Sequence, residues 1–144
     1  MPSPELERLA DRGLLKREPP GRAEVAGLIR SAAERLLDAQ RQDLSLDSRF
    51  DLAYNAAHAL ALAALRASGY RAEKRYLVFQ CLAHTLATPA PTWRLLVKCH
   101  EERNQIEYEG MPNVNEVLVA DLTAAARELL ERVRELPPPG DREA

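Results

Sequence analysis

The feature that most constrains the fold is an alanine-rich segment between residues 53 and 64, in the middle of a long predicted helix. Its methyl side chains spread around most of the helix circumference, at Ala53, Ala56, Ala57, Ala59, Ala61, Ala63 and Ala64. Small side chains let neighbouring helices approach closely, so other helices can pack against this segment on more than one side. We therefore predict that it is the central helix of a bundle, and that its surface serves packing rather than a cofactor.

The rest of the chain also divides into helices joined by short turns, and no strand pattern competes with them. Ser3 and Ser48 occupy N-cap positions, and Gly69 and Pro137 mark helix ends. These signals and the apolar stripes predict helices over residues 4–11, 23–40, 48–68, 74–87, 93–108 and 114–136. Unequal lengths without an internal period favour an all-α, single-domain helical bundle with about five main helices. We divide the chain into a short N-terminal helix and linker (1–20), the bundle (21–136) and a disordered tail (137–144).

Length and charge limit the classes of function. A chain of 144 residues can bury a core without disulfides or metal. Its formal net charge of -2 provides no overall attraction for a polyanion, so any nucleic acid contact would depend on a local basic patch. The sequence also lacks H-E-x-x-H, P-loop and G-x-S-x-G motifs and clustered zinc ligands. We therefore expect no metal and no cofactor.

The two cysteines indicate a reducing compartment. Cys81 and Cys99 each lie within an apolar helical pattern and form no C-x-x-C pair, which is typical of buried free thiols. The amino terminus lacks the charged and apolar regions of a signal sequence, and the most apolar run, residues 56–65, is too short to cross a bilayer. We expect a cytoplasmic protein that does not enter membranes.

Arg103 has an unusual position in the helix predicted over residues 93–108. With helical spacing, Leu96, Cys99 and Ile106 form an apolar stripe that this guanidinium interrupts. A charge at such a position needs a partner, and Glu107 lies four residues further on. In one interpretation, Arg103 pairs with Glu107 at a half-exposed helix edge and has no further role.

A row of hydrogen-bonding side chains lies beside Arg103. His100, Asn104 and Tyr108 follow one another at intervals of four residues, so they share one side of the helix. In a second interpretation, this row and Arg103 form a functional site. The other two histidines lie in other helices and are interpreted as packed or edge residues.

Three segments carry a family pattern: the Arg49–Ala57 opening of the alanine-rich helix, Gly69–Arg71 at its end, and Arg103–Asn104. Together they resemble the HEPN family, small helical bundles of prokaryotic toxin–antitoxin, defence and nucleotidyltransferase-associated systems. The resemblance covers residues 23–136. It implies a metal-independent ribonuclease site with an arginine, a polar residue after it, and a histidine four to six residues beyond the arginine. Arg103 and Asn104 match the first two positions, and we include Arg49 and Tyr54 of the opening, with Arg103 and Glu107, among the candidate binding residues.

The third position of the motif departs from the family pattern. Five residues after Arg103 stands Tyr108, and no histidine follows it in the chain. Cleavage through the ribose 2′-hydroxyl needs a base that titrates near neutrality, whereas a phenol with a pKa near ~10 is protonated there. The resemblance therefore implies a degenerate ribonuclease motif.

Helix geometry bears on assembly. Positions five apart are turned by about 140°, so Arg103 and Tyr108 of one copy should not converge on one small ligand. A twofold axis beside this helix would bring the residues of two copies into a shared cleft, as the resemblance to dimeric HEPN proteins implies. We expect a homodimer whose interface includes this helix and Leu96.

These observations lead to three expectations about function. The first is a HEPN-like dimeric binding or regulatory protein that acts on RNA, nucleotides or a protein partner, in a toxin–antitoxin or stress and defence system. The second is a metal-independent endoribonuclease with a rearranged site, in which Arg103 stabilises phosphate charge and His100 or Tyr108 transfers the proton. The third is a structural partner of a nucleotidyltransferase-like protein, without chemistry of its own.

Overall fold

The computed structural model describes residues 3–109 and 114–138, except for the side chains of residues 106–109. In chain order the elements are α1 (Pro4–Asp11), β1 (Lys16–Arg17), α2 (Arg22–Ala39), α3 (Leu46–Ala67), β2 (Tyr70–Arg71), α4 (Arg75–Gln80), α5 (Leu82–Thr85), α6 (Ala90–Glu109) and α7 (Glu116–Arg134). The predicted all-α bundle is confirmed. Within the described ranges, no helix is both long and apolar enough to span a membrane.

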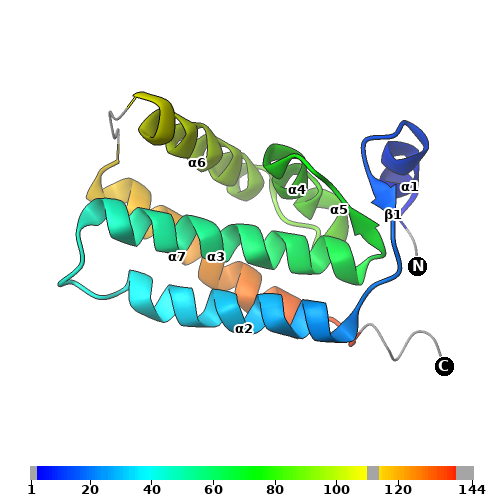
Figure 1. Cartoon of the computed structure of the whole chain (residues 1–144), viewed down its shortest axis with the longest axis horizontal. Helices are drawn as coiled ribbons and strands as arrows, with labels where there is room; N and C mark the ends of the chain where they lie inside the picture. The colour runs from blue at the N-terminus through cyan, green and yellow to red at the C-terminus, as the bar shows by residue number, and fades with distance from the viewer. Residues whose placement is uncertain (1–2, 110–113, 139–144) are drawn as a thin grey trace.

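The long α3 helix is the centre of the bundle. It packs against α2 and α7 on one side, and α4, α5 and α6 cover its other side (Figure 1). All the alanines between residues 53 and 64 are at most 6 % exposed, which confirms that the methyl-rich surface serves helix packing. Because the methyl groups occupy little space, helices approach α3 from both sides. The larger Tyr54 side chain, also buried, faces the α4 and α6 side.

Several helix boundaries differ from the prediction, and α6 and α7 begin at Ala90 and Glu116 rather than at residues 93 and 114. The α3 helix begins at Leu46, because Ser45 rather than Ser48 is the N-cap, and the Ser45 side chain accepts a hydrogen bond from the Ser48 amide at 3.1 Å. The single helix predicted over 74–87 is two short helices that meet at Cys81. Phe79 and Cys81 would face nearly opposite sides of a regular helix, about 200° apart, and the break accompanies the burial of both.

A small antiparallel sheet was not predicted. Lys16 pairs with Arg71, and Arg17 pairs with Tyr70. Gly69 precedes β2 with a φ of 92°, a conformation that glycine adopts without steric cost. Strands of two residues are too short to show an alternating pattern, so only the folded chain reveals them.

The N-terminal segment is joined to the bundle by a buried arginine. Arg66 of α3 is 2 % exposed and donates hydrogen bonds to the carbonyls of Glu18 (3.1 Å) and Pro19 (2.8 Å). It also donates to the Glu24 carboxylate at 3.0 Å and to the Tyr70 carbonyl at 3.2 Å. These contacts hold the segment before α2 against the end of α3.

Candidate functional site

Tyr54 is the centre of the candidate site. Its ring is 0 % exposed, packs edge-on against Phe79 of α4 with ring centroids 5.8 Å apart, and stacks on Phe50 at 6.3 Å. Burial raises the pKa of the Tyr54 phenol, so the hydroxyl remains protonated at neutral pH. The ring therefore forms a rigid, uncharged support between α3, α4 and α6.

His100 connects Tyr54 to Asn104. Its Nδ1 lies 3.0 Å from the Tyr54 hydroxyl oxygen, and its Nε2 lies 3.3 Å from Nδ2 of Asn104. A neutral imidazole satisfies both contacts as they stand in one tautomer, and in the other tautomer if the Asn104 amide is turned over. Either Nδ1–H donates to the tyrosine oxygen while Nε2 accepts from the Asn104 amide, or the tyrosine donates to Nδ1 while Nε2–H donates to the amide oxygen. In both arrangements the two ring nitrogens are engaged.

The charge state of His100 follows from its surroundings. Burial lowers the pKa of His100, and the positive charges of Arg75 and Arg103 lower it further, against a smaller opposing effect of Glu101. The imidazole is therefore neutral at pH 7. His100 thus acts in this structure as a hydrogen-bonding bridge between α3 and α6 rather than as a cation.

Arg103 lies over the same tyrosine. Its guanidinium carbon is 5.3 Å from the Tyr54 ring centroid, within the range of a cation–π contact. Its Nε lies 4.0 Å from a carboxylate oxygen of Asp51, whose side chain is 62 % exposed. An exposed carboxylate at this distance neutralises a guanidinium only weakly. With its own side chain 23 % exposed, Arg103 can still reach an external anion.

Arg75 was missed in the sequence interpretation. It is the first residue of α4, and its guanidinium carbon lies 5.8 Å from the Tyr54 ring centroid. The signal that singled out Arg103 was also present here. Val78 and Leu82, three and seven residues further on, are buried, so Arg75 stands at the start of an apolar stripe, where a charge is likewise unexpected.

His58, expected to be a packed residue, lies at the edge of this group. Its ring packs edge-on against Phe79 with centroids 5.7 Å apart. Burial lowers the pKa of His58 to about 4, with further lowering by Arg75, His100 and Arg103. His58 is thus a neutral neighbour of the two arginines at physiological pH.

Four other predicted positions have different outcomes. Arg49 is not in the Tyr54 group, because it contacts α2 through the Ala39 carbonyl (3.3 Å) and α7 through Glu116 (3.5 Å). The side chains of Glu107 and Tyr108 lie outside the described residues, so the proposed Arg103–Glu107 pair and the role of Tyr108 stay predictions. The expected interface role of Leu96 needs correction, since its side chain is 0 % exposed and belongs to the core of its own chain.

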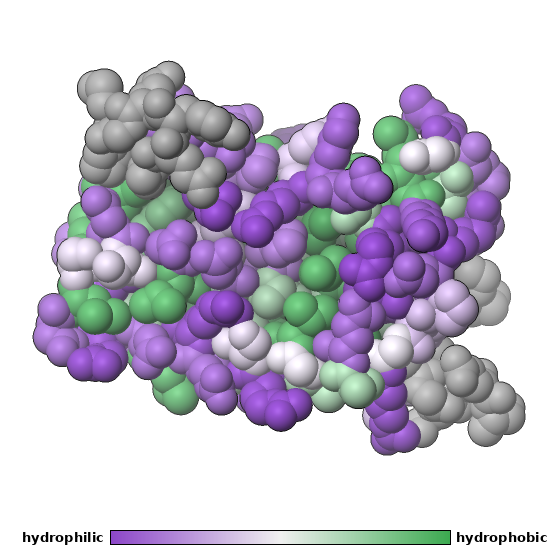
Figure 2. Space-filling model, in the orientation of Figure 1, coloured by the Kyte–Doolittle hydropathy of each residue, from purple (hydrophilic) through white to green (hydrophobic). Residues whose placement is uncertain are grey.

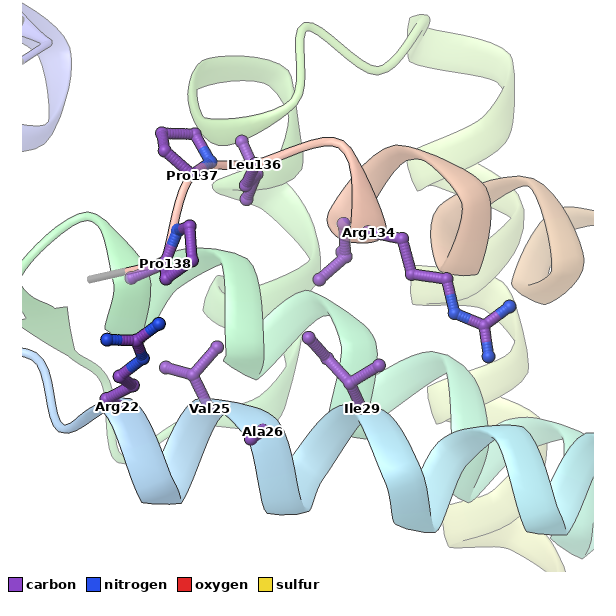
Figure 3. A pocket seen from close by; sticks show the side chains of 10 residues that line it. Arg22, Val25, Ala26, Ile29, Arg134, Leu136, Pro137 and Pro138 are labelled. Atoms are coloured by element: carbon purple, nitrogen blue, oxygen red, sulfur yellow. The ribbon is translucent and has the colours of Figure 1, made fainter. Parts of the chain in front are cut away.

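An apolar groove on the other side of α3 is a different kind of feature. It encloses about 280 Å³ between α2, the end of α7 and the segment that follows it, and Figure 3 shows Val25 and Ile29 directed toward Leu136. Arg22 and Arg134 stand at its edge, and its described lining residues include no acid or histidine. It therefore lacks groups for acid–base chemistry.

The remaining reactive groups do not form a second centre. Cys81 and Cys99 are buried free thiols, as predicted, and burial raises their pKa to about 11 and about 12. Among the described residues, no three His, Cys, Asp or Glu side chains are grouped to hold a metal ion. The Tyr54 group thus combines two cations with a neutral imidazole, an arrangement suited to binding an anion.

Comparisons with known protein families, with curated proteins and with solved structures found no match to this chain.

Proposed function

We propose that this chain is a HEPN-like binding or regulatory protein that recognises the phosphate of RNA or of a nucleotide. The observation that carries the proposal is the engagement of both ring nitrogens of His100, by Tyr54 and Asn104, beside the guanidinium of Arg103. An imidazole with both nitrogens occupied is poorly placed to exchange protons with a substrate. The neighbouring guanidinium has the charge and the paired donors that phosphate binding requires.

The cellular setting is part of the same proposal. The resemblance to HEPN proteins supports a toxin–antitoxin or stress and defence system, with a nucleotidyltransferase-like protein as a candidate partner. The buried free thiols of Cys81 and Cys99 are compatible with a cytoplasmic location. Co-purification from the native host with a tagged chain tests the partner, and an untagged lysate is the control.

A metal-independent ribonuclease is the second candidate function. It is favoured by the neutral state of His100, because only a neutral imidazole can accept the proton of a ribose 2′-hydroxyl. For this reaction His100 would have to release Tyr54 or Asn104 when RNA binds. Tyr108 is the alternative proton donor, and Arg103 would stabilise the phosphorane charge.

One experiment separates the two functions. A fluorescent single-stranded RNA is titrated with the wild type, Arg103→Ala and Arg94→Ala, and cleavage of the same RNA is followed with chelator present. Arg94 is an exposed arginine on α6 that contacts Trp93, so it is a matched control for charge. We expect binding that Arg103→Ala weakens, without cleavage. Cleavage by the wild type that Arg103→Ala abolishes would favour the enzyme, and equal affinity of all three proteins would assign Arg103 a structural role.

A homodimer along α6 belongs to this proposal. The resemblance to dimeric HEPN proteins and the partial exposure of Arg103 on α6 support it. In the orientation of Figure 1, the surface is mainly hydrophilic, with separate hydrophobic areas (Figure 2). Light scattering at micromolar concentration measures the assembly state. Gln105→Arg, at an exposed position of α6, is a suitable interface variant, whereas a Leu96 variant would report on the core of the single chain.

A further inference from the structure

We infer that Arg75 and Arg103 form a two-arginine clamp that holds one phosphate group above the buried Tyr54. The inference rests on the proposed function and deepens it, because it adds a second binding residue and defines the chemistry of the ligand. The two guanidinium carbons lie 5.8 Å and 5.3 Å from the centroid of the same ring, although they come from α4 and α6. Both arginines also act electrostatically on His58 and His100, so they share three neighbours.

Arg75 has donor capacity that the fold does not use. Its side chain interacts with the Tyr54 hydroxyl, but its Nη1 is buried and makes no hydrogen bond to any described residue. Burying such a donor without an acceptor costs free energy. Arg66 is an internal comparison, because its guanidinium donates to three carbonyl groups and to the Glu24 carboxylate. Arg66 therefore has a structural role, whereas Arg75 keeps an Nη1 donor that a ligand oxygen can accept from.

Charge favours the same ligand. Two guanidinium groups face the Tyr54 ring, both histidines beside it are neutral at pH 7, and the facing carboxylate of Asp51 is largely solvated. Arg75 and Arg103 thus bring two positive charges to one ring, against the carboxylates of Asp51 and Glu101, in a chain whose formal net charge is -2. A phosphate monoester has three terminal oxygens and a diester has two, arranged tetrahedrally rather than in one plane as in a carboxylate, so one phosphate group can accept hydrogen bonds from two guanidinium groups.

Tyr54 has a positioning role in this clamp. Its ring is 0 % exposed, so a nucleotide base cannot stack on it in this structure. The ring instead positions the two guanidinium groups through cation–π contacts, and its hydroxyl is positioned by Nδ1 of His100. The clamp therefore recognises the phosphate group and does not distinguish one base from another. Two sources supply such a phosphate: the terminal group of a nucleotide, or the diester backbone of single-stranded RNA.

The test compares two probes and four variants. Adenosine 5′-monophosphate and a ten-residue oligoribonucleotide without terminal phosphates are titrated into the wild type, Arg75→Ala, Arg75→Lys, Arg103→Ala and the control Arg94→Ala. We expect Arg75→Ala and Arg103→Ala each to lower affinity about tenfold or more, with Arg75→Lys intermediate and Arg94→Ala within about twofold of wild type. The probe that binds identifies the source of the phosphate.

Failure of the clamp and failure of the proposed function give different results. If Arg103→Ala weakens binding while folded Arg75→Ala and Arg75→Lys bind like wild type, the clamp is wrong and phosphate recognition stands. If neither probe binds the wild type at millimolar concentration, the proposed function itself is wrong. If Arg75→Ala does not fold, the side-chain Nε–Hε resonances of the wild type decide. A shift of the Arg75 resonance on addition of the probe supports the clamp, and a shift of Arg103 alone overturns it.

Discussion

Nδ1 of His100 lies 3.0 Å from the hydroxyl oxygen of Tyr54, although the two residues are 46 positions apart in the chain. This contact joins the central helix α3 to α6, the helix that carries Arg103 and Asn104. It also aligns the two rings, whose planes differ by 21°. The hydrogen bond therefore sets the relative position of the tyrosine that supports the arginines and the helix that carries one of them.

Removing the Tyr54 hydroxyl should weaken the contact between α3 and α6 and leave the two arginines beside the ring. Tyr54→Phe retains the ring beneath Arg75 and Arg103, and leaves one nitrogen of His100 without its partner. We expect the free energy of unfolding to fall by about 1–2 kcal/mol, the cost of a lost buried hydrogen bond. Urea denaturation measures the change, and Tyr76→Phe at a partly exposed position is the control. Equal stability of both variants would show that the hydroxyl contact contributes nothing to joining α3 and α6.

Tyr108 offers a direct test of the proposed degenerate ribonuclease motif. We expect the wild type to cleave RNA poorly or not at all, and Tyr108→His to create or raise metal-independent cleavage. An imidazole with a pKa near ~6.5 can accept and return a proton at neutral pH, five residues after Arg103. Cleavage is assayed with chelator, and Arg103→Ala/Tyr108→His controls for contaminating nuclease. An inactive Tyr108→His would mean that more than this residue separates the chain from active HEPN ribonucleases.

The pKa of His58 predicts a specific pH dependence of stability. Its pKa falls from 6.5 in the unfolded chain to about 4 in the folded protein, so the unfolded state binds a proton first as pH falls. Stability should therefore be constant well above pH 6.5 and decline as pH falls, by roughly 2 kcal/mol at pH 5 and roughly 3 kcal/mol at pH 4 from this group. Below about pH 4.5, carboxylates with lowered pKa values, such as Glu18 and Glu24, add to the loss.

Replacing His58 isolates its contribution. Denaturant unfolding at pH 7.0, 6.0 and 5.0 is compared for the wild type, His58→Gln and the exposed control His84→Gln. We expect His58→Gln to flatten the decline over this range and His84→Gln to retain it. An unchanged slope in His58→Gln would place the proton uptake elsewhere, and His100 would be the next residue to replace, because its pKa is also lowered.

Ala87 marks a strained position in the turn before α6. Its φ is 52°, in the left-handed region where the Cβ atom is disfavoured by about 1–2 kcal/mol. Ala87→Gly should therefore stabilise the protein by about 0.5–1 kcal/mol, after the larger chain entropy of glycine is subtracted. Thermal unfolding measures the gain. The matched control Ala124→Gly, at an exposed position inside α7, should instead lose about 1 kcal/mol.

Local patterns determined much of the bundle. The alanine-rich segment predicted a central helix, and the apolar stripes predicted where the long helices lie, because helix formation and amphipathic burial depend on residues within a few turns. Residue type did not determine the N-cap of α3, since Ser45 and Ser48 are both good capping residues and only Ser45 precedes the helix. The His100–Asn104 contact was also visible in the sequence, as residues four apart on one helix.

Tertiary structure decided what surrounds that pair. Tyr54, Arg75 and Arg103 come together from three helices, and nothing in their separate spacings says that α4 and α6 cover the same side of α3. The same holds for Arg49, which stands five residues before Tyr54 and contacts α2 and α7 on the opposite side. Helical periodicity determines which side chains share a face. The choice of the helix that each face meets depends on the packing of the whole chain, because burial is optimised over all helices together.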